Sequence, residues 1–246
     1  MAINKESNGF TFGFAITMVV IVGTILALLA MGLKPKKNAN DRVKKKMDIL
    51  SAFLNLEEEK ISRSNAEKEF DKYVDLKNAI VLDQNGNLKD GIKAFDVDIK
   101  KENRDKTLKE SDKNYPLFIG KNKEGKTVYI IPVVGKGLWG PIWGNICVGE
   151  DKQTIVGASF GHKTETPGLG AEISQEFFVA GWRNEKISDV DFNFKKFEVV
   201  KDGSGKQMEG KVDGITGGTI TSKGVEEMAN RCLKVYVKYF KSLNNE

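Results

Sequence analysis

The sequence contains few of the residues that bind transition metals or form disulfides. Among its 246 residues are two cysteines, Cys147 and Cys232, and one histidine, His162. Tetrahedral zinc sites and cysteine-ligated iron–sulfur clusters need several such ligands at regular spacings, so the sequence excludes both kinds of site. Both cysteines lie in apolar patterns, which favours two buried free thiols over the alternative of a disulfide between them.

Charge of one sign is not concentrated over most of the chain. The formal net charge is +5, and acidic and basic residues are interleaved as on an ordinary solvated surface. A dense basic run occurs at residues 34–46, directly after a long apolar segment. Contact with a membrane surface explains that run more simply than contact with nucleic acid, so we expect no nucleic-acid partner.

The long apolar segment is residues 10–33, FTFGFAITMVVIVGTILALLAMGL, which carries no charged side chain. A helix of this length, at about 1.5 Å per residue, crosses a hydrocarbon core about 30 Å thick. A cleaved signal peptide is disfavoured, because the start offers only Lys5 beside Glu6 and no small-residue cleavage pattern follows. We therefore predict a permanent transmembrane helix after a tail of residues 1–9. The lysines and arginine that follow it would, by the positive-inside rule alone, place the rest of the chain in the cytoplasm.

The remaining sequence predicts one α+β domain with a mainly antiparallel sheet and flanking helices. Residues 34–75 read as a juxtamembrane helical segment and residues 76–246 as the domain. A capping box at Ser64 and Glu67 is expected to open a helix that runs to Val74. The closing helix is expected from about Ser222, with Val225, Met228, Cys232, Val235 and Tyr239 on its apolar face. Strands are predicted at 79–82, 95–99, 117–120, 127–134, 142–148, 154–160, 191–194, 197–200 and 207–212.

Two glycine-rich segments could hold a ligand. Residues 135–144, GKGLWGPIWG, combine glycines, which allow close backbone approach, with tryptophans on which an aromatic ring could rest. Packing of those tryptophans into the core is the alternative. Residues 162–170, HKTETPGLG, offer hydroxyls, a carboxylate and a turn. A general-base role for His162 is disfavoured, because no nucleophile partner is evident.

A third segment, residues 213–222 (DGITGGTITS), reads as a strand end, a glycine-rich turn and a helix start. This arrangement receives phosphate, because free amides and the helix dipole favour negative charge there. The alternative is that Thr221 or Ser222 is only an N-cap. No Walker lysine pattern accompanies the turn, which argues against an ATPase.

Together, and in this order behind one span, these segments resemble the family of C subunits of the Na+-translocating NADH:quinone reductase. The resemblance also covers the post-anchor stretch KKKMDILSAF and the stretch ETPGLGAE. Members carry FMN in a phosphoester to a threonine of an S/T-G-A-T-x-T motif. The matching residues here are 216–221, with Thr219 in the esterified position and Gly218 where the family usually has alanine.

The resemblance implies a cofactor site without catalytic residues or metal ligands of its own. Thr219 would bear the covalent FMN, with Thr216, Gly217, Gly218 and Thr221 beside it. The residues implied around the flavin ring are Glu165, Thr166, Leu169, Gly170, Leu138 and Trp139.

The implied function is an electron relay within NADH:ubiquinone reductase (Na+-transporting), with no turnover by the isolated chain. The implied partners are the A, B, D, E and F subunits of that reductase, the lipid bilayer, and a separate flavin transferase that uses FAD. The resemblance places the domain on the periplasmic side of the bacterial inner membrane, against the positive-inside count.

Three alternatives stay open from the sequence. The nearest is the homologous FMN-carrying G subunit of an Rnf-type, ferredoxin-linked electron-transport complex. The second is a membrane-anchored extracytoplasmic binding domain without a redox role. The third is a free-standing flavin enzyme, which would oxidise NADH alone.

Overall fold

The computed structural model describes residues 8–244, so residues 1–7 of the predicted tail lie outside the described residues. Within it the chain forms two units, residues 1–45 and 46–246, which are treated separately below.

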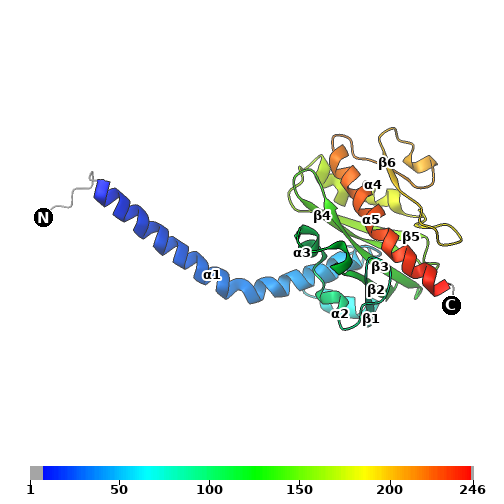
Figure 1. The fold of residues 1–246 in the computed structure, drawn as a ribbon, viewed down its shortest axis with the longest axis horizontal. Coiled ribbons are helices and arrows are strands. Elements are labelled where there is room, and N and C mark those ends of the chain that lie inside the picture. The colour runs from blue at the N-terminus through cyan, green and yellow to red at the C-terminus, as the bar shows by residue number, and fades with distance from the viewer. Residues whose placement is uncertain (1–7, 245–246) are drawn as a thin grey trace. The chain divides into compact units, whose positions relative to one another are not determined.

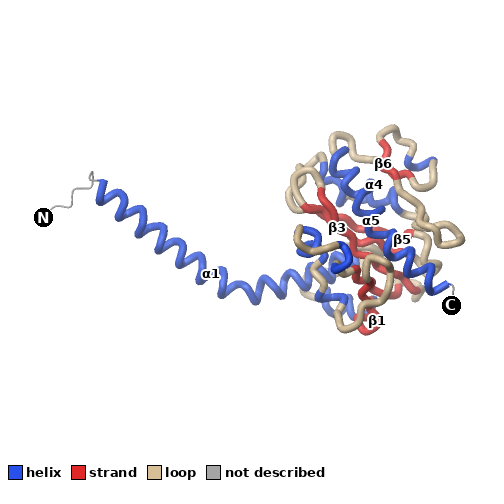
Figure 2. Tube along the Cα trace, viewed as in Figure 1, coloured by secondary structure: helices blue, strands red, loops and turns tan. Residues whose placement is uncertain are grey.

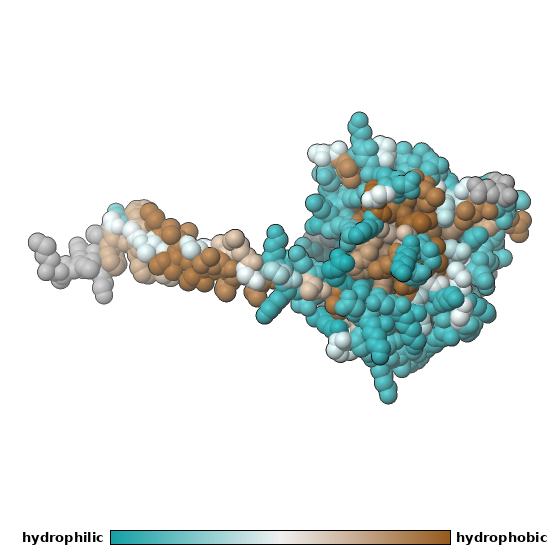
Figure 3. All heavy atoms as spheres, turned by 90° about the horizontal axis from the view of Figure 1, so that it is seen from below, coloured by the Kyte–Doolittle hydropathy of each residue, from teal (hydrophilic) through white to brown (hydrophobic). Residues whose placement is uncertain are grey.

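The first unit is helical. It holds most of α1 (Asn8–Leu50), which contains Pro35 and is long and apolar enough to cross a membrane. No residue of its most apolar stretch is buried within the protein, and Figure 3 shows apolar side chains along it. Val19 is 72% exposed and Met31 72% exposed. Such a surface is stable in lipid and not in water, which agrees with the predicted span over residues 10–33.

The second unit is built on a five-stranded antiparallel sheet in the order β1-β2-β3-β4-β5. The strands are β1 (Val74–Leu82), β2 (Tyr115–Lys121), β3 (Thr127–Lys136), β4 (Pro141–Val148) and β5 (Ile155–His162). Each strand pairs with its neighbour in sequence, and Figure 2 draws the strands in red among the helices and loops of the domain. A separate parallel pair is formed by β6 (Glu198–Val200) and β7 (Lys211–Asp213). The predicted α+β class with a mainly antiparallel sheet is confirmed.

One face of the sheet is covered by α5 (Thr219–Asn244), which runs across the strands in Figure 1. The short helix α4 (Glu176–Val179) packs against the same core. The predicted apolar face of α5 is confirmed at the positions that are buried, Val225, Met228, Cys232 and Val235. Tyr236 and Phe240 are fully buried as well, because the helix lies flat on the sheet and buries a broad stripe.

The other face is covered by the segment that precedes β1. The last turn of α1, from Lys46, and α2 (Ala66–Tyr73) lie there. The side chains of Asn145 and Ser159 donate to the carbonyl of Asp48, at 2.9 and 3.1 Å. A Cβ atom at Gly157 would lie 2.1 Å from the carbonyl oxygen of Ala52, so only glycine permits this approach.

Two predicted strands are wrong because aspartates form local turns there. The side chain of Asp98 accepts from the amide of Lys101 and opens α3 (Ile99–Arg104), where the alternation of apolar residues predicted a strand. At 191–194, the carboxylate of Asp189 accepts from the amides of Asp191 and Asn193. The backbone there turns instead of extending.

The predicted capping box is also wrong. Asn65 precedes α2, and no side chain caps the helix. The hydroxyl of Ser64 contacts that of Ser62, while Glu67 pairs with Lys46 at 2.9 Å. A tertiary ion pair therefore uses the carboxylate that the sequence assigned to the cap.

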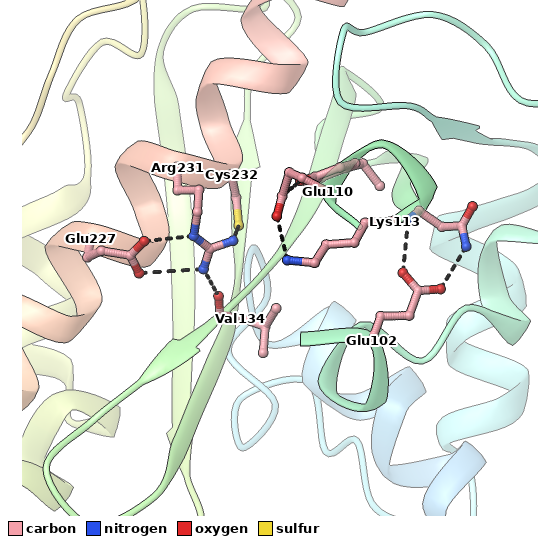
Figure 4. A network of polar contacts seen from close by, with 9 residues as sticks. Glu102, Glu110, Lys113, Val134, Glu227, Arg231 and Cys232 are labelled. Carbon is pink, nitrogen blue, oxygen red and sulfur yellow. Dashed lines mark hydrogen bonds and ion pairs between the residues drawn. The ribbon is translucent and has the colours of Figure 1, made fainter. Parts of the chain in front are cut away.

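The part of β3 after Ile130 has no pairing with β2, because β2 pairs with β3 only from Phe118 onward. A side chain of α5 bonds to this open edge. Arg231 donates to the carbonyl oxygen of Val134 at 2.7 Å, as Figure 4 shows. Cys232 is buried beside it, and burial raises the pKa of its thiol. Cys147 is also buried, and both cysteines are free thiols, as predicted.

Candidate functional site

The structure brings the three predicted segments together at one end of the sheet. They are the hairpin tip 137–140 between β3 and β4, the loop 163–170 after β5, and the turn 214–218 before α5. The amides of the hairpin tip donate to Glu165 in the second segment. A Cβ atom at Gly170 would lie 2.4 Å from the Thr221 hydroxyl oxygen. Such close approaches show that the segments pack directly on one another.

The closing helix begins at Thr219, earlier than the predicted start at Ser222. The carbonyl of Gly218 accepts from the amide of Ser222 at 2.9 Å, so Gly218 takes the N-cap place. The Ser222 hydroxyl donates to the same carbonyl at 3.0 Å and accepts from the amide of Ile215 at 3.1 Å. Ser222 therefore braces the first turn from inside the helix. The first amides of α5 have no partner within the helix and can receive an anion.

The turn before the helix depends on Gly217. Its φ of 74° lies in the left-handed region that favours glycine, and a Cβ atom would lie 2.6 Å from Leu169 Cδ2. At Gly218, where the family usually has alanine, a Cβ atom would lie 2.9 Å from Ile215 Cγ2. The carbonyl oxygen of Leu169 would lie 3.0 Å away, so alanine would require both the Ile215 side chain and the Leu169 backbone to shift in this protein.

Only some hydroxyls of the turn are accessible. Thr221 is 1% exposed and donates to Glu165 at 2.5 Å, and Ser222 is fully buried. Thr216 is exposed and precedes the helix, whereas Thr219 is half-buried and is its first residue. Within residues 8–244, the structure gives the Thr219 hydroxyl no hydrogen-bond partner. Thr219 therefore offers a hydroxyl without a partner in the described chain, at the N-terminal end of α5.

Glu165 joins the three segments. Its carboxylate accepts from the amides of Trp139 at 2.8 Å, Gly140 at 3.2 Å and Leu138 at 3.3 Å. It also accepts the Thr221 hydroxyl, and its side chain is buried, with 4% exposure. Burial raises the pKa of Glu165, but these hydrogen bonds outweigh burial and hold the pKa below its ordinary value of 4.5.

The lowered pKa of Glu165 predicts a pH-dependent contribution to stability. The contribution is complete above pH 4.5 and is lost as the pH falls through the lower pKa of the folded protein. Urea unfolding of the wild type and of Glu165→Gln, from neutral pH to about pH 3, measures the contribution of Glu165 to the free energy of unfolding. We expect the difference in unfolding free energy to shrink below pH 4.5. A difference that stays constant with pH would contradict this assignment.

Exposed apolar side chains lie on the segments that meet at this end of the sheet. These residues, here called the apolar rim, come from the hairpin tip, the loop after β5 and the first turn of α5: Leu138 is 46% exposed, Trp139 66%, Leu169 41% and Ile220 60%. An exposed apolar cluster of this kind is typical of a binding surface, and a flat aromatic ring fits it. Ile220 is not among the residues that the resemblance implied, although an apolar residue in a polar helix start was a usable signal.

Three other predicted or considered residues have clear positions. Thr166 is exposed, and its carbonyl accepts from the amides of Leu169 and Ala171. His162 accepts the Glu165 amide at 3.2 Å, which is a structural contact. Trp143 is not part of the rim: it packs on Gly161, and Lys100 Nζ lies 3.4 Å from the centroid of its ring.

A shallow hollow, open to solvent, lies between α3 and α5. Its charged groups are already paired, as Figure 4 shows: Lys113 with Glu110 and Arg231 with Glu227, while Glu102 accepts from Asn114. These charged side chains are thus bonded within the protein, and the turn at Thr219 is the better candidate site.

A helix end with free amides, an accessible hydroxyl and an apolar rim fit a phosphate that carries an aromatic ring system. In agreement, residues 137–234, which contain all three segments, match the family model described as the FMN-binding domain. The fold and the site therefore define a flavoprotein with a membrane-spanning helix. The predicted FMN cofactor is confirmed.

Comparison with whole proteins identifies the family more closely. The chain is 30% identical over 240 residues to the C subunit of the Na(+)-translocating NADH-quinone reductase of Vibrio parahaemolyticus, covering 92% of this chain and 90% of that protein. The solved structure of the same subunit from Parabacteroides distasonis is 39% identical, with a TM-score of 0.71 over 84% of this chain and 96% of that one. The chain belongs to the family of C subunits of the Na(+)-translocating NADH-quinone reductase.

The structure of Shewanella oneidensis NqrC supports the fold alone, with 21% identity and a TM-score of 0.62 over 83% of this chain and 98% of that chain. The resemblance seen in the sequence is confirmed. These relatives favour the quinone-reductase family over the Rnf-type alternative and over a binding domain without a redox role.

Proposed function

We propose that this chain is the electron-relay subunit of a membrane-bound Na+-translocating NADH:quinone oxidoreductase, with FMN esterified to Thr219. The observation that carries the attachment site is the state of the hydroxyls in the turn. Thr221 and Ser222 are buried and hydrogen-bonded within the protein, and the exposed Thr216 precedes the helix. Thr219 is half-buried, makes no hydrogen bond within the described residues, and is the first residue of α5.

The attachment is a phosphoryl transfer that uses FAD as donor. The Thr219 oxygen forms a bond to the phosphorus of the FMN half, the bond between the two phosphates breaks, AMP leaves, and the hydroxyl proton is released. The phosphodiester that results keeps one negative charge. The free amides of the first turn of α5 and the helix dipole stabilise that charge.

The protein supplies position and surroundings, and bound FMN supplies reversible redox chemistry. The apolar rim gives the isoalloxazine ring a surface on which to lie. Thr166 and Gly170 are proposed to line the same side, in the loop that carries Leu169. The covalent link prevents loss of the cofactor in either oxidation state.

A separate flavin transferase is proposed to make the bond. The other proposed partners are the A, B, D, E and F subunits of the reductase. As a relay, the isolated chain is expected to oxidise no NADH, which a spectrophotometric assay of the purified flavinylated protein measures. NADH oxidation by the chain alone would instead support a free-standing flavin enzyme.

The domain is proposed to lie on the periplasmic side of the inner membrane, although the basic run after the span favours the cytoplasm. A single cysteine introduced at Glu124, an exposed residue of the turn between β2 and β3, reports the side directly. The proposal requires labelling of intact cells by a membrane-impermeant maleimide. Labelling only after cell lysis would show that the domain faces the cytoplasm and would overturn the proposed orientation.

The proposed attachment is tested on the wild type made together with its transferase. Intact mass spectrometry should show the chain increased by FMN less one water, and peptide mapping should place the increase on Thr219. An unmodified chain, or modification elsewhere, would overturn the attachment site.

A further inference from the structure

The hydrogen-bonding capacity of Glu165 is fully used within the protein. A carboxylate offers about four lone-pair sites. Here Oε1 accepts from the amides of Trp139 and Gly140, and Oε2 accepts from the Thr221 hydroxyl and the amide of Leu138. No acceptor site is left for the ring or the ribityl chain of a flavin.

The carboxylate also lies in a cage that excludes a ligand sterically. A Cβ atom at Gly137 would lie 2.6 Å from Oε1, and one at Gly170 would lie 2.7 Å from Oε2. Two glycines therefore give the carboxylate its space, and the three successive amides of the hairpin tip form an anion-binding nest around it. The cage is therefore filled by the Glu165 carboxylate itself, with no room for a ligand.

We propose that Glu165 is a positioning residue: it fixes the hairpin tip to the first turn of α5 and so sets where the flavin ring lies relative to Thr219, without touching the flavin. This inference rests on the proposed function, and it replaces the ring contact that the family resemblance implied for this residue. The rim residues Leu138 and Trp139 hold their place because Glu165 binds their backbone amides.

The same geometry assigns a role to Thr221. Its hydroxyl carries one proton, which is donated to Glu165, and its side chain is buried. Thr221 therefore anchors the carboxylate to α5, while Thr219, two residues earlier in the same turn, remains accessible for the ester. The Thr221 hydroxyl therefore holds the segments of the site together, and the Thr219 hydroxyl is the proposed attachment point.

The test compares Glu165→Gln with Glu172→Gln in flavinylated protein. Glu172 lies in the short 3-10 helix (Gly170–Ser174) that follows the loop of Glu165, and it accepts the amide of Gly168 at 2.8 Å but makes no hydrogen bond to the hairpin tip among the described residues. The glutamine at position 165 brings an NH2 group against amide donors, so the tip should separate from α5. The expected results are about tenfold to a hundredfold faster hydrogen exchange at amides 138–140 and a changed visible circular dichroism of the flavin. Glu172→Gln should change neither.

If Glu165→Gln fails to fold, Thr221→Val tests the same contact, because valine removes the hydroxyl and keeps the shape of the threonine side chain. It should raise exchange at the same amides by a smaller factor, both in flavinylated protein and in protein made without the transferase. Unchanged exchange and an unchanged flavin signal in the folded variants would overturn the positioning role. A wild type that carries no FMN would instead overturn the proposed function. The contact between Glu165 and α5 can still be tested in that case, because hydrogen exchange is measured in unmodified protein as well.

Discussion

Thr219→Ala is expected to yield folded protein that carries no covalent FMN. The Thr219 side chain is half-buried, and the structure gives its hydroxyl no bond to lose within the described chain, so alanine removes the reactive oxygen with little effect on packing. Alanine is also the best helix former, so α5 should begin as before. The measurement is intact mass after co-expression with the transferase, together with flavin fluorescence in a denaturing gel. Both signals should fall to background.

The neighbouring hydroxyls provide matched controls. Thr216→Ala removes an exposed hydroxyl in the same turn and should retain full flavin mass. Thr221→Ala should reduce retention less than Thr219→Ala, because it weakens the tie to Glu165 and leaves the attachment oxygen in place. Thr219→Ser keeps a hydroxyl and should recover part of the signal. Full FMN mass on Thr219→Ala would move the attachment to another residue.

Gly224→Ala is expected to destabilise the protein, although the same change in an ordinary helix stabilises it by about 1 kcal/mol. Gly224 lies where α5 crosses the end of β3, and a Cβ atom would lie 2.4 Å from the carbonyl oxygen of Lys136. Gly135 makes a matching approach, since its Cβ would lie 2.6 Å from Met228 Cβ. Because backbone cannot move aside as a side chain can, overpacking here should cost about 3 kcal/mol or more.

The measurement for Gly224→Ala is the urea midpoint at constant m-value, with flavin incorporation as a second result. Since the helix must move away from β3, the first turn of α5 should shift and incorporation should fall. Lys223→Ala is the control: it changes an exposed neighbour on the same helix and should alter the unfolding free energy by less than about 0.5 kcal/mol. A stabilised Gly224→Ala would show that α5 and β3 do not approach so closely.

Agreement between sequence and structure is best where the signal is local. The strands β2 to β5 follow from apolar runs bounded by polar turns, and the predicted ranges match them closely. The alternation of apolar and polar residues at 95–99 predicted a strand that does not form. Asp98 is also a good N-cap for a helix, and the sequence pattern alone does not show which of the two structures is more stable. The Ser64 capping box failed because Glu67 is drawn to Lys46, far away in sequence.

The sequence by itself determined the membrane span, the antiparallel sheet and the hydroxyl-rich turn with its Thr219 motif, because each depends on residues that are neighbours along the chain. Only the tertiary structure decided which hydroxyls are accessible, where α5 begins and what Glu165 does. Those properties depend on contacts such as the one between Glu165 and Thr221, 56 residues apart. Burial and hydrogen-bond saturation arise only when such distant segments pack together, so no local pattern encodes them.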